Sequence, residues 1–168
     1  MFVIRAERPH DYPGVRHVHE RAFPGPDEAD LVDALRRAGA HVPELCLVVV
    51  ADDRVVGHIA LSQARLEPAG VAVLALAPMA VHPDWQRRGA GSALVREALG
   101  RATATDFPLV VVVGHPGYYP RFGFEPGEAH GVTAPFEVDP GAWMVHLLPA
   151  HRHDIRGRVT FAQPFDAV

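Results

Sequence analysis

The sequence predicts an α/β (α+β) fold, a mixed and mostly antiparallel central sheet of six or seven strands with one splayed parallel pair and about four flanking helices. Two observations lead to this prediction. Apolar runs separated by short polar turns follow one another through the middle of the chain, which is typical of an antiparallel meander. A glycine-rich turn then leads from one such run into an amphipathic helix and a further apolar run, which indicates a right-handed crossover between parallel strands.

The first part of the chain predicts one strand and two helices. Residues Phe2–Ala6 form a short apolar run that is typical of a strand. Apolar side chains at helical spacing follow, and Asp11 precedes them as a candidate N-cap. A second helix opens at Asp27 or Glu28, and we expect Gly39 to end it because glycine readily adopts the left-handed conformation of a helix C-terminus.

Three consecutive runs predict the meander. They cover Leu45–Ala51, Arg54–Ala64 and Val71–Val81, with short polar turns between them. Pro78 interrupts the third run, and proline removes one donor from a strand ladder. A bulge there would bend this strand away from its parallel neighbour, whereas the alternative is that the run lies at the edge of the sheet.

The crossover and the end of the chain supply the remaining elements. We expect a helix from the glycine turn to Leu99, a buried strand at Leu109–Val113, a short helix at Tyr118–Phe122, and strands at Gly123–Glu125, at Ala142–Leu148 and within Ile155–Phe165. No internal repeat or linker divides the chain, so we expect one domain over residues 2–148 and a C-terminal extension of the same domain over residues 149–168.

Composition excludes several classes of function. The 168 residues carry a formal net charge of −4, and all 16 basic residues are arginine, which removes lysine-dependent mechanisms. The negative net charge leads us to expect no nucleic-acid binding. No apolar run approaches the ~18 residues of a membrane span and the N-terminus lacks the pattern of a signal peptide, so we expect no membrane binding and a cytoplasmic protein. Cys46, the only cysteine, lies in a strand pattern typical of a buried thiol. The 11 histidines show no strong ligand spacing, so we expect no metal.

The residues between the third run and the crossover helix favour anion binding. A helix N-terminus offers unpaired N–H groups and a partial positive charge to a phosphate. Gly89 and Gly91 let the backbone approach an anion closely, and Arg87 and Arg88 add charge. The segment matches neither the dinucleotide fingerprint nor the P-loop. The alternative is an ordinary helix entry with two arginines in solvent.

A bulge at Pro78 would have a functional consequence. It would leave backbone groups of Met79 and Val81 without a strand partner. An extended ligand that contains amides, such as pantetheine, could pair with them and place its pyrophosphate on the glycine loop.

These residues resemble the GNAT N-acetyltransferase superfamily. The segment Gln86–Gly91 matches its signature Gln/Arg-X-X-Gly-X-Gly/Ala, Met79–Pro83 resembles the strand before that signature, and Tyr119–Phe124 resembles a segment that ends in Gly-Phe. The resemblance covers roughly residues 2–148. Within the superfamily, the chain is similar to bacterial acetyltransferases of the YhbS type.

The resemblance implies acetyl-CoA as the donor and Tyr119 as the general acid that protonates the departing thiolate, with Tyr118 as a possible substitute. A phenol suits this role because its pKa of about 10 keeps it protonated at neutral pH. It further implies that the cofactor contacts two groups of residues. These are Met79, Ala80 and Val81 along pantetheine and the acetyl carbonyl, and Gln86, Arg87, Arg88, Gly89, Ala90, Gly91 and Ser92 around the pyrophosphate.

The general base is less clear in the sequence. Many relatives carry an asparagine where this chain has His115, and none of the residues of the third run is a carboxylate. The candidates are therefore Glu28, His58, His82 and His115, and the alternative for Glu28 is a helix N-terminal charge. The acceptor would be a small-molecule amine or a peptide N-terminus, and a homodimer stays open.

Three functions remain in competition. The first is an N-acetyltransferase that moves an acetyl group from acetyl-CoA to a primary amine by direct attack in a ternary complex, with a backbone N–H near Ala80 stabilising the intermediate. The second is a non-catalytic acyl-CoA sensor on the same fold. The third is a phosphate-binding domain unrelated to CoA, which the segment at Tyr119–Phe124 disfavours.

Overall fold

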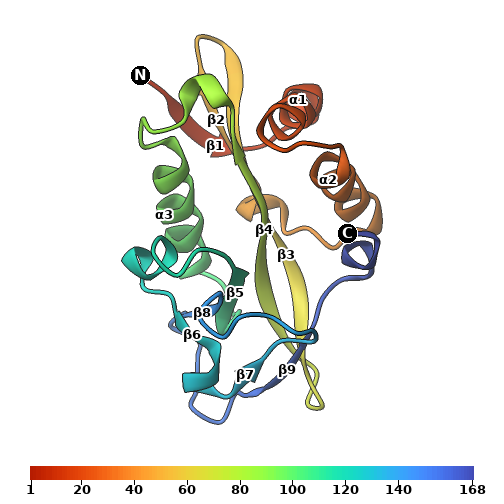
Figure 1. Cartoon of the computed structure of the whole chain (residues 1–168), viewed down its shortest axis with the longest axis vertical. Coiled ribbons are helices and arrows are strands. Elements are labelled where there is room, and N and C mark those ends of the chain that lie inside the picture. The colour runs from red at the N-terminus through yellow and green to blue at the C-terminus, as the bar shows by residue number, and fades with distance from the viewer.

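The computed structural model describes residues 1–168 and contains three α-helices and nine strands (Figure 1). The helices are α1 (Tyr12–Ala22), α2 (Asp27–Ala38) and α3 (Ala90–Ala102). The strands are β1 (Val3–Ala6), β2 (Leu47–Ala51), β3 (Arg54–Glu67), β4 (Val71–Val81), β5 (Leu109–Val113), β6 (Glu125–Pro126), β7 (Val132–Thr133), β8 (Trp143–Leu147) and β9 (Gly157–Thr160).

All nine strands join one sheet, and seven of them follow the order β1-β2-β3-β4-β5-β8-β6. Neighbours in this order are antiparallel except β4 and β5, which are parallel and connected through α3. Strand β9 pairs with the far end of β3, and β7 pairs with β9. In Figure 1, α3 lies on one side of the sheet and α1 and α2 lie on the other. The predicted antiparallel meander and parallel crossover are therefore confirmed.

The element counts differ from the prediction for local reasons. The sheet has nine strands rather than six or seven, and β7, with two residues, leaves no periodic pattern. The strand expected at Gly123–Glu125 is β6 at Glu125–Pro126, because Gly123 adopts the left-handed region at φ 90°. The expected short helix is a 3₁₀ helix over Tyr119–Phe122, so there are three α-helices rather than four. Strand β2 begins at Leu47, because Pro43–Leu45 form a 3₁₀ turn before it.

The helix boundaries follow the sequence signals with one exception. Gly39 ends α2 in the left-handed region, at φ 66°. Asp11 stands at the N-cap of α1, but its side chain does not cap that helix. Its carboxylate instead accepts hydrogen bonds from Arg5 Nη1 and Nη2, at 2.6 and 2.9 Å, and from the Arg8 amide at 2.7 Å. The predicted N-cap side chain therefore forms an ion pair with Arg5 instead, and this pair connects β1 to the start of α1.

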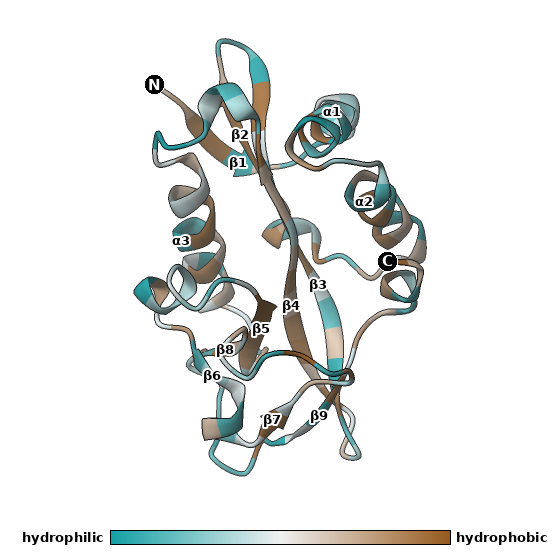
Figure 2. Cartoon of the chain, in the orientation of Figure 1, coloured by the Kyte–Doolittle hydropathy of each residue, from teal (hydrophilic) through white to brown (hydrophobic).

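Apolar side chains pack the helices against both faces of the sheet. Figure 2 shows hydrophobic strands β4 and β5 in the centre and hydrophilic residues along α1 and α2. The largest core cluster joins α3 to the sheet through Leu94, Val95 and Ala98, all fully buried. Cys46 is buried as well, and burial raises the pKa of its thiol to about 12. No helix combines the length and hydropathy that a membrane crossing requires.

Candidate active site

Strands β4 and β5 pair over only two positions. The paired residues are Leu74 with Val110 and Ala75 with Val111. On the other side of β4, the partner of Ile59 is Met79 and the partner of Leu61 is Leu76. Two residues of β4, Ala77 and Pro78, therefore stand opposite a single residue of β3. This is the predicted bulge, and β4 leaves its parallel neighbour from that point on.

Beyond the bulge, alternate residues of β4 turn their backbone toward the split. The His82 amide donates to the Val56 carbonyl at 2.8 Å, so the alternation of an antiparallel ladder directs Ala80 toward β3 as well. Met79 and Val81 consequently point their backbone groups away from β3. The side-chain amide of Gln86 donates to the Val81 carbonyl at 3.0 Å, which anchors the start of the glycine loop to the edge of the split.

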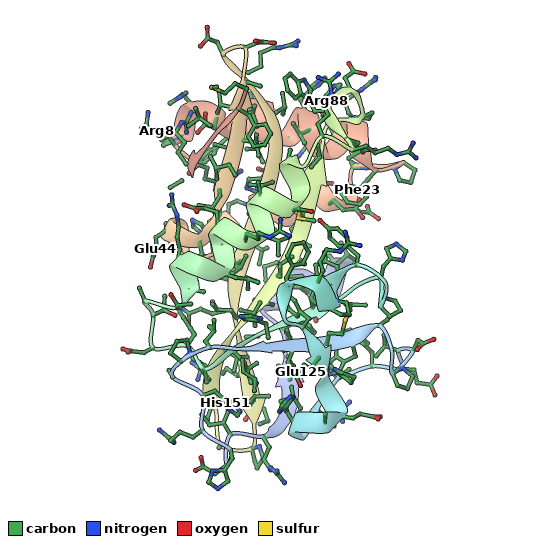
Figure 3. All side chains as sticks on the ribbon, turned by 90° about the vertical axis from the view of Figure 1, so that its left-hand side faces the viewer. Arg8, Phe23, Glu44, Arg88, Glu125 and His151 are labelled. Atoms are coloured by element: carbon green, nitrogen blue, oxygen red, sulfur yellow. The ribbon has the colours of Figure 1, made fainter.

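The glycine loop leaves the N-terminus of α3 open. Gly89 precedes the helix at φ 85°, and Arg87 also adopts the left-handed region at φ 64°, which is uncommon for a residue with a side chain. No side chain caps α3, so the amides of its first turn have no partner in the protein. Arg88 lies beside this end of the helix, with its guanidinium 4.8 Å from the centre of the Trp85 ring (Figure 3).

Tyr118 borders the open helix end and is itself held by Arg121. The Tyr118 hydroxyl lies 3.0 Å from Ser92 Oγ, in the first turn of α3. Arg121 places its guanidinium 4.7 Å from the centre of the Tyr118 ring and donates to the Tyr118 carbonyl at 3.0 Å. Arg121 itself lies beside the later turns of α3, where it lines a shallow pocket with Arg96, Leu99 and Gly100.

The split opens into a cavity of about 730 Å³. Strands β4 and β5 form one wall, α2 and the residues before it a second, and the end of the chain a third. Glu28, His115 and Tyr119 bring polar side chains to this cavity, and Met79 joins them from β4. The other lining residues are Phe23, Leu31, Leu76, Ala77, Pro78, Val111, Val112, Val113, Gly114, Phe136, Phe161, Phe165 and Val168.

Tyr119 is held rigidly at the end of β5. Its ring lies on the Cα of Gly114, and the His115 carbonyl accepts hydrogen bonds from the Tyr118 and Tyr119 amides at 3.0 and 3.3 Å. Burial, with a smaller contribution from Tyr118, raises the pKa of the Tyr119 phenol to about 12. The group therefore carries its proton throughout the neutral range.

The four base candidates separate into two groups. Glu28 and His115 line the cavity, and Glu28 is only partly buried in the first turn of α2. His58 is fully buried on the α1–α2 side of β3 and does not line the cavity; it is hydrogen-bonded to Glu7 and His19 at 2.9 Å each. His82 accepts from the Asp84 amide and lines a different cavity, beside α1.

His58 belongs to a buried polar network. Arg36 contacts Glu7 at 2.8 Å. Burial alone would raise the pKa of Glu7, but hydrogen bonds from His58 and Arg36 outweigh it and hold that pKa at about 2. Burial, reinforced by His58, lowers the pKa of His19 to about 3. The network belongs to the α1–α2 side, and none of its members lines the cavity, although the His19 ring stacks on Phe23 of the cavity wall.

The sequence did not identify the third wall of the cavity. Phe161, Phe165 and Val168 reach it from the chain end, and Phe136 reaches it from the loop after β7. The only available signal was the aromatic character of residues 161–165. No group of His, Cys, Asp and Glu side chains in the structure is arranged to hold a metal ion.

A comparison of the sequence with family models finds the Acetyltransferase (GNAT) family over residues 12–124. The N-acetyltransferase YjhQ of Escherichia coli strain K12 is 34% identical over 160 residues, which are 92% of this chain and 88% of that protein. The N-acetyltransferase YhbS of the same strain is 33% identical over 149 residues, which are 87% of each chain.

Solved structures give the same result for the fold. The structure of YhbS from Escherichia coli in complex with CoA has a TM-score of 0.91 at 30% identity, and the match covers 98% of this chain and 92% of that one. A GNAT family acetyltransferase from Brucella melitensis in complex with acetyl-CoA has a TM-score of 0.82 at 31% identity, over 99% of both chains.

Proposed function

The chain belongs to the acetyltransferase (GNAT) family, and from this premise we propose that it transfers the acetyl group of acetyl-CoA to a primary amine by direct attack in a ternary complex. One observation carries the proposal. The uncapped N-terminus of α3 stands at the mouth of the split between β4 and β5, and the split leads into the cavity that holds Glu28, His115 and Tyr119. The helix end would bind the pyrophosphate, and the gap between the strands would hold pantetheine. The cavity residues would supply the base and the acid that the transfer needs.

The cofactor would lie along the split. Its pyrophosphate would accept hydrogen bonds from the loop Gln86–Gly91 and Ser92, where the left-handed Arg87 and Gly89 turn backbone amides toward an anion. Arg87 and Arg88 would add charge to this contact. The backbone groups of Met79 and Val81 on either side of Ala80 would pair with the amides of pantetheine, in the manner of an added strand.

The cavity residues would then divide the proton transfers. Glu28, directly or through a water molecule, takes a proton from the amine, with His115 as the alternative. As the nitrogen–carbon bond forms, the Met79 amide stabilises the negative charge on the carbonyl oxygen; its backbone faces the split, whereas that of Ala80 faces β3. Tyr119 gives its proton to the sulfur as the carbon–sulfur bond breaks. The products are an N-acetylated amine and free CoA.

We also propose that residues 149–168 belong to the same domain as residues 2–148. Strand β9 lies in the central sheet next to β3, and Phe161 and Phe165 line the cavity. Removal of the extension would therefore take away both a strand and a wall of the site.

Release of the CoA thiol in the presence of amines tests the proposal. A disulfide reagent reads this thiol directly, because the buried Cys46 has a pKa of about 12 and does not compete. We expect acetyl-CoA to bind and the thiol to appear only when an amine is added. A protein that does not bind acetyl-CoA, or binds it without transfer to any amine, contradicts the proposal.

A further inference from the structure

The aromatic wall of the cavity, formed by Phe136, Phe161 and Phe165, narrows the class of acceptor. Resting on the proposed function, we infer that the acceptor is an apolar primary monoamine, such as an arylalkylamine. Its nitrogen would point toward Glu28 and its hydrocarbon body would lie on this wall. Polyamines, aminosugars and free amino acids would be poor acceptors, because they bring additional charged or polar groups to an apolar wall.

The wall is an ordered aromatic surface. The rings of Phe136 and Phe161 are nearly parallel, with their centres 6.0 Å apart, and Phe165 lies 5.2 Å from Phe161. Trp143 supports both Phe136 and Phe161 edge-on at 6.2 Å, and its indole N–H donates to the Val132 carbonyl at 2.9 Å. Support from behind fixes the rings before any ligand arrives, which favours binding of a rigid apolar body.

Part of this wall is still exposed to solvent. Phe136 remains 50% exposed, and Phe161 and Phe165 are partly exposed, whereas Trp143 behind them is buried. A bound hydrocarbon would cover this ring and remove its apolar surface from water, which provides the free energy of binding. The volume of about 730 Å³ is within the range of small-molecule sites.

The charges around the cavity select against polar acceptors. Glu28 is the only carboxylate side chain among the lining residues, and no arginine is among them. A polyamine would carry further ammonium groups into a site with no second carboxylate side chain. The carboxylate of an amino acid would lie near Glu28 with no arginine to pair with it. An unpaired charge in an apolar site is strongly unfavourable, so one ammonium group matches the site and additional charges do not.

Two matched amines test the inference with acetyl-CoA and the full-length protein. 2-Phenylethylamine and phenylalanine differ only in the carboxylate, and spermidine represents the polyamines. We expect kcat/KM for 2-phenylethylamine to exceed that for phenylalanine and for spermidine by more than about 100-fold, since the extra charge would be buried without a partner. Acetyl-CoA binding is measured separately by calorimetry.

A pair of variants then locates the effect. Phe136→Ala should raise KM for 2-phenylethylamine about ten-fold, the loss expected for an aromatic contact, and leave KM for acetyl-CoA unchanged. Because Phe136 is half exposed, this variant should fold. Val3→Ala removes another exposed apolar side chain, on β1 and away from the cavity, and should change neither constant.

The outcomes separate the inference from the proposed function. Release of CoA with phenylalanine or spermidine as readily as with 2-phenylethylamine overturns the inference and leaves the transferase function intact. An unchanged KM in Phe136→Ala also overturns it, because the wall would then not contact the acceptor. If no amine releases CoA, the proposed function fails and the inference fails with it.

Discussion

The ring of Tyr119 rests directly on Gly114, at the point where β5 ends. A Cβ added at Gly114 would stand 2.6 Å from Cδ2 of the tyrosine, and closer still to Cε2, so only glycine allows the ring to occupy its observed place. The residue at the end of the strand thus determines where the phenol lies in the cavity. This relationship makes the role of Tyr119 testable from two positions in the chain.

The first prediction concerns this pair. Tyr119→Phe should lower kcat by about 10²- to 10⁴-fold, the usual contribution of a general acid, and leave acetyl-CoA affinity nearly unchanged. Gly114→Ala should also lower kcat, because it displaces the ring. The double variant should be no slower than Tyr119→Phe alone, since both changes act on one group.

A glycine in the same loop supplies the control. A Cβ at Gly117 would meet no atom within 4 Å, so Gly117→Ala should keep full activity. Steady-state rates of all four variants decide the matter. If the effects of Tyr119→Phe and Gly114→Ala multiply in the double variant, the two residues act independently and the positioning argument is wrong.

The second prediction concerns Gly91, which lies inside α3. A Cβ there would be 3.6 Å from Val81 Cγ2 and 3.7 Å from the Tyr118 hydroxyl, which are ordinary contacts. Gly91→Ala should therefore fold at least as stably as the parent, because alanine has the higher helix propensity. In the proposed complex, however, the new methyl group would crowd the pyrophosphate. Overpacking of about 1–3 kcal/mol would weaken acetyl-CoA binding by roughly 5- to 150-fold.

Gly100 in the same helix provides the matched comparison. It is exposed, and a Cβ there would have open space. Gly100→Ala should raise the melting temperature and leave the Kd of acetyl-CoA unchanged. Titration calorimetry measures the Kd, and thermal unfolding measures stability. Equal affinity in the two variants would show that the cofactor does not approach Gly91.

Local features of this fold were open to prediction, and long-range ones were not. The glycine loop, the bulge at Pro78 and the end of α2 at Gly39 each depend on a few adjacent residues, whose backbone preferences can be read directly. The wall formed by Phe136 and Phe161 depends instead on the pairing of β9 with β3 and β7. Nothing in a two-residue strand indicates its partner in advance.

The same distinction applies to the histidines. The strand pattern placed His58 in a strand but did not decide which face it occupies. Its buried position depends on residues distant in the sequence: Glu7 and His19 hydrogen-bond to it, and Arg36 pairs with Glu7. The buried, structural role of this histidine therefore depends on tertiary contacts on the α1–α2 side, which the local sequence does not show. The roles of Glu28, His115 and Tyr119 remain predictions that the shared cavity supports.

The third prediction concerns stability in acid. His19 has a folded-state pKa of about 3, below its usual value near 6.5, so the unfolded chain binds a proton that the folded protein excludes. Stability is therefore complete above pH 6.5 and falls by about 1.4 kcal/mol per pH unit for this group as the pH drops toward 3. Glu7, at about 2, adds a similar loss below its ordinary pKa near 4.5.

Urea unfolding between pH 7 and pH 4 measures this dependence. In His19→Gln the free energy of unfolding should fall less steeply between pH 6.5 and pH 4.5, because one group fewer takes up a proton on unfolding. The variant should also be less stable at pH 7, because the contact with His58 changes. His153→Gln, on the exposed chain near the end, should leave the slope as it is. An identical slope in His19→Gln would mean that this imidazole is not the group that titrates.

The last prediction distinguishes a catalytic Glu28 from a helix charge. Glu28 and Asp27 both lie in the first turn of α2, where each should stabilise the helix by about 0.3–1 kcal/mol. Only Glu28 lines the cavity. Glu28→Gln and Asp27→Asn should therefore lower the melting temperature by similar small amounts, because each removes one negative charge from the same helix end.

Turnover should separate the two variants. Glu28→Gln should lower kcat/KM by about 10²- to 10⁴-fold, since the group that accepts the proton is lost. Asp27→Asn should leave kcat/KM unchanged. If the two variants keep the same activity, Glu28 is only a helix charge. A large loss in His115→Gln, which removes the other proton acceptor at the cavity, would then assign the base to His115.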